Sequence, residues 1–307
     1  MAELESSMAP IKPKRGLGKA ILISSRPKQW TKNLLVLAAP IAAGSITSPR
    51  IIIPSIVAIV SFTLAASGIY MLNDSFDIEL DRMHPKKSSR PIAAGELSRQ
   101  LAYVISAVLI IAGVSVAYIY SGNDLGMVIT IYVLINIAYS RLLKHEPIVD
   151  ILSVSLGFLL RSIAGGVADH VFLSNWFLIV ASFGSLFVVV CKRMAEVQLL
   201  GDEAFTHRAS LAKYPEGFLN YVRTISSGVA MTAYCLWAFE KGASSPKGAI
   251  WIESSILFFV AAILRYSLLV EQGHGGAPEE MLFEDRSLQS IGLIWIIVLI
   301  IGIYVSR

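Results

Sequence analysis

Charged residues are scarce in this chain of 307 residues. Asp, Glu, Lys and Arg together make up 16% of it, hydrophobic residues make up 55%, and the mean hydropathy is +0.65. Because soluble domains carry roughly a quarter charged residues, this composition excludes an ordinary soluble globular protein. Low charge combined with long apolar runs is typical of membrane-spanning chains. The sequence therefore predicts an integral membrane protein in contact with lipid.

Cysteine is rare and histidine is scattered. The two cysteines, Cys191 and Cys235, lie in or beside apolar segments, and the five histidines form no cluster with ligand spacing. A disulfide framework and a thiolate metal centre are therefore not expected. The net charge of +4 is modest, and we attribute it to membrane topology and anionic substrates. Nucleic acid is not an expected partner.

Long apolar segments dominate the chain instead. Nine of them approach the ~20 residues that cross the hydrocarbon as an α-helix. They lie at about 30–48, 52–72, 99–120, 125–143, 148–168, 174–191, 221–240, 249–270 and 287–305. The prediction is an all-α polytopic bundle of nine transmembrane helices, with a polar tail at 1–25 and one domain at 26–307. Its two long connections, about 73–98 and 192–220, are predicted to cap one face.

Lys and Arg are distributed unequally between the two sides of this bundle. If nine spans alternate, most of the 26 basic residues fall in the tail and in the connections on the tail's side. The positive-inside rule places that side in the cytoplasm. We therefore expect a multi-pass protein of the plasma (inner) membrane with a cytoplasmic N-terminus. Oligomeric state is left open, a homo-oligomer included, because lipid-facing and protein-facing apolar surfaces have similar compositions.

An acidic stretch at 73–81 directly follows the second apolar segment. Asn73, Asp77 and Asp81 lie four residues apart, and each step of four advances about 400° on a helix, so they form one slowly turning stripe. Carboxylates at a membrane helix end are costly unless a positive group sits against them. Mg²⁺ prefers such oxygen ligands and completes its shell with water and phosphates. The stretch predicts a magnesium–diphosphate site, with a solvated acidic helix end as the alternative.

Basic side chains at the same membrane face are candidate phosphate ligands. Arg can bind phosphate as a two-pronged donor and Lys as a point charge, although the positive-inside bias alone would also place such residues here. Lys28 or Arg26 could reach a phosphate from the segment 26–33, whose simplest role is anchoring at lipid headgroups. The candidates are Lys28, Lys86, Arg90, Tyr139, Lys144, Arg161, Lys192, Arg193 and Glu196.

These features together resemble the UbiA-type membrane prenyltransferase superfamily. The resemblance rests on the nine spans, on Asn73, Asp77 and Asp81, on Arg90-Pro91, and on Leu160-Arg161 with Gly165. It implies an all-helical bundle around a lipid-open cavity, with a magnesium-dependent active site on the cytoplasmic side. By this resemblance Mg²⁺ binds Asn73, Asp77 and Asp81, Asp74 assists, and the three aspartates are the catalytic residues.

One part of the chain departs from the superfamily. Most members have a second aspartate-rich motif where this chain has Lys192, Arg193 and Glu196. Cations at that position favour a second phosphate over a second metal cluster. The pattern resembles the branch that transfers 5-phosphoribosyl from phosphoribosyl pyrophosphate to a polyprenyl phosphate in arabinan synthesis. The alternatives are a prenyltransferase acting on an aromatic or haem-like acceptor, and a transporter or lipid-binding protein without chemistry.

Overall fold

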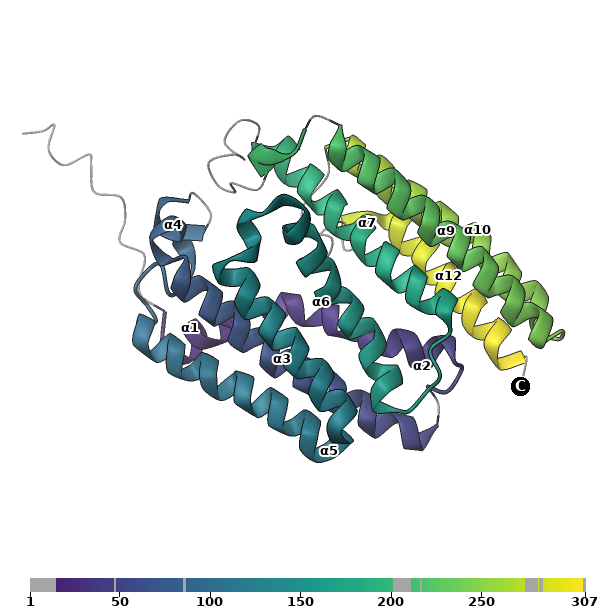
Figure 1. Cartoon of the computed structure of the whole chain (residues 1–307), viewed down its shortest axis with the longest axis horizontal. Coiled ribbons are helices and arrows are strands. Elements are labelled where there is room, and N and C mark those ends of the chain that lie inside the picture. The colour runs from purple at the N-terminus through teal and green to yellow at the C-terminus, as the bar shows by residue number, and fades with distance from the viewer. Residues whose placement is uncertain are drawn as a thin grey trace, which may run out of the picture.

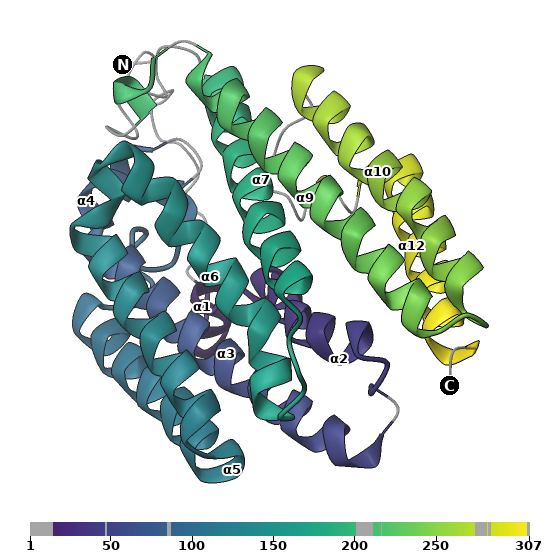
Figure 2. The ribbon, with the colours of Figure 1, turned by 45° about the vertical axis from the view of Figure 1, so that its right-hand side comes forward.

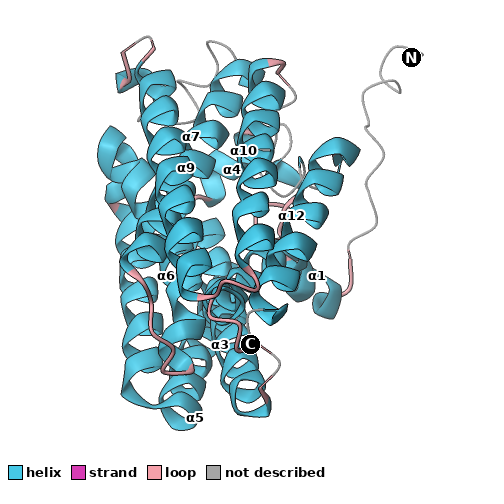
Figure 3. Cartoon of the chain, turned by 90° about the vertical axis from the view of Figure 1, so that its right-hand side faces the viewer, coloured by secondary structure: helices cyan, strands magenta, loops and turns pink. Residues whose placement is uncertain are grey.

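The computed structural model describes residues 15–46, 48–84, 87–200, 211–215, 217–273, 281 and 284–305. Across these ranges the regular structure is entirely helical, which confirms the predicted all-α class (Figure 3). Among the described residues, six helices are long and apolar enough to cross a membrane. These are α3 (Pro49–Phe76), α5 (Arg99–Arg141), α6 (Pro147–Ala168), α7 (Asn175–Leu200), α10 (Ala249–Glu271) and α12 (Arg286–Val305).

The helices divide into two neighbouring groups (Figures 1 and 2). In the first group, α3, α5 and α6 bury a shared apolar cluster that includes Phe62, Ile129 and Leu160. In the second group, α7 packs along α9 (Phe218–Ser244), and α10 packs along both α9 and α12. The helices α6 and α7 also contact each other and join the two groups.

The helix α5 is really two helices. Gly122 lies inside it with φ 77° and ψ −166°, a conformation that glycine adopts readily because it has no Cβ. The chain reverses there, so that the ring of Tyr118 packs against Gly126. This break falls between the predicted spans 99–120 and 125–143, so α5 contains both of them.

The first predicted span, 30–48, does not form one regular α-helix, and that expectation is corrected. A short helix α1 (Leu17–Ser24) is followed by a 3-10 helix η1 (Pro27–Leu37) and by α2 (Ala38–Ala42). Proline interrupts this stretch at Pro27 and Pro40, and a proline inside an α-helix removes a backbone donor. The segment instead packs closely on α6, where Gly165 lies against the carbonyl of Val36.

Shorter elements complete one end of the bundle. They are α4 (Ile78–Met83), η2 (Lys87–Ser89), η3 (Leu143–His145) and η4 (Leu211–Lys213). The helix α7 continues to Leu200, beyond the predicted span at 174–191, so Lys192, Arg193 and Glu196 lie on its last turns and not in a connection. The helix α4, the α5–α6 connection and the last turns of α7 all lie at this end (Figures 1 and 2).

Replacing Gly165 by alanine tests the contact between η1 and α6. A Cβ at this position would overlap the carbonyl oxygen of Val36 and lie 3.0 Å from Cδ of Pro40. Overpacking of this kind costs about 1–3 kcal/mol, so we expect Gly165→Ala to lower the midpoint of thermal unfolding in detergent. The matched control is Gly184→Ala in α7, where a Cβ meets open space within 4 Å. Equal midpoints for the two variants would contradict the close packing.

Candidate functional site

The acidic stretch forms the junction of α3 and α4. Asp77 ends α3 with φ −94° and ψ 14°, and α4 begins at the next residue. Helical hydrogen bonds nevertheless run across the junction, from Asp77 N to Asn73 O at 3.0 Å and from Asp81 N to Asp77 O at 2.8 Å. The amide of Asn73 also donates to Asp77 Oδ2 at 3.2 Å. The spacing of four residues therefore does bring Asn73 and Asp77 side by side.

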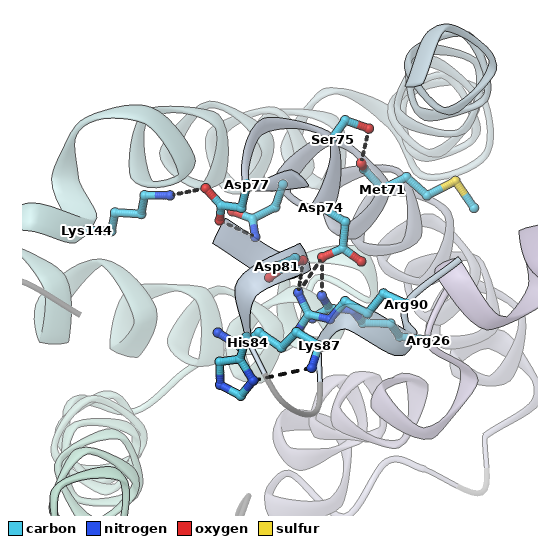
Figure 4. A network of polar contacts seen from close by, with 11 residues as sticks. Arg26, Met71, Asp74, Ser75, Asp77, Asp81, His84, Lys87, Arg90 and Lys144 are labelled. Carbon is cyan, nitrogen blue, oxygen red and sulfur yellow. Dashed lines mark hydrogen bonds and ion pairs between the residues drawn. The ribbon is translucent and has the colours of Figure 1, made fainter. Parts of the chain in front are cut away.

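Cations from three other elements contact these carboxylates (Figure 4). Arg90 Nη1 lies 3.0 Å from Asp74 Oδ1 and 2.7 Å from Asp81 Oδ2. Lys144 Nζ lies 2.6 Å from Asp77 Oδ1, and Arg26 forms a further ion pair with Asp74. The predicted stripe of Asn73, Asp77 and Asp81 is therefore divided between two sets of cations. Asp74 and Asp81 share Arg90, whereas Asp77 pairs with Lys144.

Burial explains why these cations are needed. Asp74 and Asp81 are each only 3% exposed. A buried carboxylate without a partner carries a large desolvation cost, which a hydrogen-bonded cation offsets. Charge-assisted bonds from arginine also fix the direction of the carboxylate. The site is therefore a compact arrangement of alternating charge whose oxygens already hold positive groups at 2.6–3.0 Å.

Arg26 reaches this site from a strained backbone. Its φ of 52° is left-handed, which is uncommon for a residue with a side chain. The residue connects α1 to η1, and its guanidinium stacks 4.9 Å from the ring centroid of Tyr70 while it pairs with Asp74. Residues held in sparsely populated conformations cluster at functional sites. Lys28, the candidate chosen from the sequence over Arg26, is exposed.

A second network, on α5, α6 and α7, surrounds Arg193. Arg193 Nε lies 2.8 Å from Asp150 Oδ2, and its Nη2 lies 3.1 Å from Asp150 Oδ1. Tyr139 donates its hydroxyl to Asp150 Oδ1 at 2.8 Å. Glu196 accepts from Arg193 Nη1 at 3.1 and 3.0 Å. Asp150 is 0% and Arg193 2% exposed, so this is a fully buried ion pair.

The two networks share one segment. Tyr139 is near the end of α5, and Lys144, which binds Asp77, lies in η3 directly after it. Lys144 follows Tyr139 by five positions, across Leu142, whose φ of −122° ends α5. The carboxylates of α3–α4 and the Arg193 network are therefore neighbours across the α5–α6 connection.

The remaining candidates are placed differently. Arg161 lies in the apolar core, where it donates to Asn33 Oδ1 at 2.9 Å, Tyr132 hydroxyl at 2.8 Å and Gly157 O at 2.7 Å. It also stacks on the ring of Tyr132 at 4.6 Å. This arrangement ties η1 to α5 and α6 and keeps Arg161 away from the two acidic networks. Lys192 is partly exposed on α7, and Lys86 lies outside the described residues.

Sequence reasoning missed Asp150. It is an acid inside a predicted span, which is a strong indication of function or of buried pairing. It is not among the sequence candidates, and its partner, Arg193, lies 43 residues away in the next helix. A search for opposite charges buried in neighbouring spans would have found it.

Comparison with known proteins identifies the family. The sequence model of the UbiA prenyltransferase family matches residues 34–283. The chain belongs to the UbiA prenyltransferase family. This confirms the resemblance inferred from Asn73, Asp77 and Asp81. Within the described residues, groups of three or more His, Cys, Asp or Glu side chains arranged to hold a metal are absent.

Two relatives of this UbiA chain match nearly its whole length. A Corynebacterium glutamicum protein named decaprenyl-phosphate phosphoribosyltransferase is 41% identical over 296 residues, covering 95% of this chain and 89% of that protein. A Mycobacterium tuberculosis protein of the same name is 42% identical over 288 residues, covering 92% of this chain and 94% of that protein. Among solved structures, a UbiA homologue from Archaeoglobus fulgidus bound to GPP and Mg²⁺ has a TM-score of 0.71 at 17% identity, covering 94% of this chain and 99% of that one. At this identity the structural likeness shows the fold alone.

Replacing Asp150 by asparagine tests the buried pair. Removing one partner of a buried ion pair costs about 3–5 kcal/mol, so we expect Asp150→Asn to lower the midpoint of thermal unfolding in detergent markedly. The control is Glu146→Gln at the start of the same helix. Its pair with Lys213 is 64% and 49% exposed, and such surface pairs contribute only about 0–1 kcal/mol. If both variants unfolded at the same temperature, the Asp150–Arg193 pair would contribute nothing to stability.

Proposed function

We propose that this chain is a decaprenyl-phosphate phosphoribosyltransferase. It transfers 5-phosphoribosyl from phosphoribosyl pyrophosphate to a polyprenyl phosphate and releases pyrophosphate, an early step in making cell-wall arabinan precursors. The observation that carries the proposal is identity of about 41% with two proteins of that name over more than nine-tenths of the chain. The absence of a carboxylate pair at the end of α7, where Arg193 and Glu196 stand, argues against ordinary prenyl transfer.

The proposed enzyme spans the plasma membrane nine times, with its N-terminus and active site in the cytoplasm. The six long apolar helices support this topology, since the break at Gly122 divides α5 into two spans and α9 has 27 residues. The segment η1–α2 supplies the remaining span in irregular form. Orientation rests on the concentration of Lys and Arg on the side of α4.

The residues of the α3–α4 junction fit a magnesium ion. They are hard oxygen ligands, and their carboxylates already attract cations to 2.6–3.0 Å. Asn73 lies beside Asp77, to which its amide nitrogen donates, and its amide oxygen is the atom that would face the ion. Asn73, Asp77 and Asp81 would hold Mg²⁺, and Asp74 assists. When bound, the ion neutralises charge on a departing pyrophosphate.

In this proposal the cations of the site would also bind the phosphate oxygens of the donor. Arg26, Arg90 and Lys144 pair with carboxylates here. When the donor's diphosphate enters together with a divalent ion, these side chains turn to phosphate oxygens, which accept their charge-assisted bonds equally well. The exchange keeps every charge paired throughout binding.

The proposed reaction is a substitution at ribose C1 that requires few further groups of the protein. The bond from ribose C1 to pyrophosphate breaks, and a bond from C1 to an oxygen of the lipid phosphate forms. Positive charge develops at C1, and the nearby carboxylates stabilise it electrostatically. The acceptor phosphate is already anionic near neutral pH, so a strong general base is unnecessary. Single displacement inverts the configuration at C1, and a product with retained configuration would refute it.

The acceptor's tail requires an apolar path through the bundle. A pocket of about 370 Å³ lies at the end opposite α4, between α2, the α6–α7 connection and α9. Its lining includes Ala39, Phe172 and Trp237. The lining also carries Glu240 and Lys241, so only its apolar part would take a section of a long polyprenyl chain.

The transferase activity of variants at the acidic residues tests the proposal directly. Membranes containing the protein are incubated with radiolabelled phosphoribosyl pyrophosphate, Mg²⁺ and polyprenyl phosphate, and label in the lipid is counted. We expect Asp77→Asn and Asp81→Asn to reduce transfer at least ~100-fold, because each weakens the binding of the Mg²⁺ that would neutralise the departing pyrophosphate. Excess chelator should do the same to the wild type. The control is Glu79→Gln, which changes a 75% exposed carboxylate of the same segment. Transfer that persists in both aspartate variants would refute the assignment.

The proposed exchange of counterions predicts how the substitution Lys144→Met changes the affinity for a divalent metal ion, with and without pyrophosphate. Without Lys144, Asp77 lacks its 2.6 Å partner, so free Mn²⁺ should bind several-fold more tightly. Binding of Mn²⁺ together with pyrophosphate should become several-fold weaker, because a phosphate ligand is lost. Both affinities are measurable on the purified protein by the electron paramagnetic resonance of unbound Mn²⁺. Lys213→Met, at the same end, serves as the control. A variant in which both affinities move in the same direction would rule out the exchange.

A further inference from the structure

One face of α3 carries a stripe of polar and aromatic side chains that contact the segment 25–33. The stripe consists of Thr63, Ser67, Tyr70 and Asp74, at positions i, i+4, i+7 and i+11. This spacing places all four on the same side of an α-helix. Each of them contacts a residue of the segment through a hydrogen bond, an ion pair or a ring contact. The segment is therefore fastened to α3 by directional contacts as well as by apolar packing.

The 3-10 conformation of η1 allows two of these contacts to form together. The amide of Asn33 donates to the hydroxyl of Thr63 at 2.9 Å, and the indole of Trp30 donates to the hydroxyl of Ser67 at 3.1 Å. Three residues of a 3-10 helix rise about 6 Å and return to the same side, and four residues of an α-helix also rise about 6 Å. The donors on η1 therefore have the same spacing as the acceptors on α3.

Trp30 also holds the backbone directly before Arg26. Its Nε1 lies 3.0 Å from the carbonyl oxygen of Ser25, and the hydroxyl of Ser67 donates to the same oxygen at 3.3 Å. The single N–H of the indole is thus shared between Ser25 and Ser67. These two serines are 8% and 4% exposed, and a buried polar group is costly to leave without a partner. Three hydrogen bonds therefore join Ser25, Trp30 and Ser67 into one closed set.

This closed set supports the strained backbone of Arg26. A side-chain-bearing residue at a φ of 52° persists only when the surrounding structure holds it there. With the backbone held, the guanidinium extends along the stripe of α3, over the ring of Tyr70 and to the carboxylate of Asp74 (Figure 4). The direction of the Arg26 side chain therefore depends on contacts made four residues later in the chain, at Trp30.

Anchoring at lipid headgroups does not account for these contacts of Trp30. A tryptophan at a membrane interface has an apolar body and a polar N–H that faces the wet side. Trp30 is half-buried, and its N–H points instead to Ser25 and Ser67 inside the bundle. The donor group of the indole is therefore used to hold the chain and not to meet the headgroups.

We infer that Trp30 is a positioning residue, which fixes the turn at Arg26 and so presents the guanidinium to the diphosphate of the donor. This inference rests on the proposed function, in which Arg26 turns from Asp74 to phosphate oxygens. Trp30 touches no substrate in this scheme and acts through Arg26. A guanidinium whose backbone is already fixed loses less conformational freedom when a ligand binds. The diphosphate is therefore bound more tightly than it would be by a freely moving arginine.

A double-mutant cycle on ligand affinity tests this role. The affinity for Mn²⁺ together with pyrophosphate is measured by the electron paramagnetic resonance of unbound Mn²⁺, in the purified wild type, Trp30→Phe, Arg26→Met and the double variant. We expect Trp30→Phe to weaken binding about 3- to 10-fold, the effect of a lost hydrogen bond. In the Arg26→Met background the same substitution should change the affinity less than about 2-fold, because residues that act as a unit are not additive.

Two further variants complete the cycle. Trp295→Phe is the matched control, because it removes another indole hydrogen bond, 2.8 Å long, to the hydroxyl of Tyr234 between α12 and α9. It should leave the affinity unchanged. Ser67→Ala removes the other partner of Trp30 with little change in volume, and it should weaken binding only when Arg26 is present. It serves as the test if Trp30→Phe does not fold. Equal weakening with and without Arg26, or no weakening at all, would overturn the positioning role.

The outcomes separate this inference from the function beneath it. A wild type that shows the coupling between Trp30 and Arg26 but moves no label from phosphoribosyl pyrophosphate to lipid would refute the proposed function and leave the positioning role standing. A wild type that transfers label, with additive effects of the two substitutions, would overturn only the role of Trp30. A wild type that does not bind pyrophosphate with Mn²⁺ would overturn the diphosphate site and this inference with it.

Discussion

Each carboxylate that the described chain buries at the α4 end of the bundle is held by a cation from another element. Asp74 has Arg26 and Arg90, Asp81 has Arg90, and Asp150 has Arg193. A lone buried charge would cost too much to keep, so these pairs decide how η1, α3, α6 and α7 meet. The same pairs supply the charges that a phosphate substrate and its metal require. Stability and proposed chemistry therefore depend on one set of interactions.

The α3–α4 network and the Arg193 network differ in how readily their ion-pair partners could be replaced. In the α3–α4 network one ion-pair contact joins Lys144 to Asp77, and one joins Arg90 to each of Asp74 and Asp81. In the proposed function, an entering metal ion and diphosphate would replace these contacts one at a time. The Arg193 network is more buried, and its guanidinium is saturated. It behaves as a rigid support. The first network is therefore the one that the proposed function uses for binding, and the second joins α5, α6 and α7.

Sequence reasoning was most successful where the physics is local. Spans in α3, α6, α10 and α12 follow from the length of apolar runs, and the break in α5 follows from Gly122 and its polar neighbours. The spacing of four residues brings Asn73 beside Asp77, although the junction at Asp77 divides the acidic stretch between α3 and α4. Reasoning failed for 30–48, where Pro40 and the close approach of Val36 to Gly165 accompany a 3-10 helix in place of a continuous α-helix. It also did not predict the partners of Arg193, since Asp150 and Tyr139 come from two other helices.

The sequence by itself determined that the chain is a helical membrane protein with an acidic motif beside basic residues. It also determined the family. Both conclusions depend on composition and on spacing over a few residues. Only the tertiary structure decided which cation meets which carboxylate, that Arg26 and not Lys28 contacts the acidic site, and that Arg161 lies in the core. The reason is that a charge buried in a bundle takes its partner from whichever helix packs against it. Which helix supplies the partner depends on how whole helices are oriented, and this orientation cannot be read from the spacing of residues along the chain.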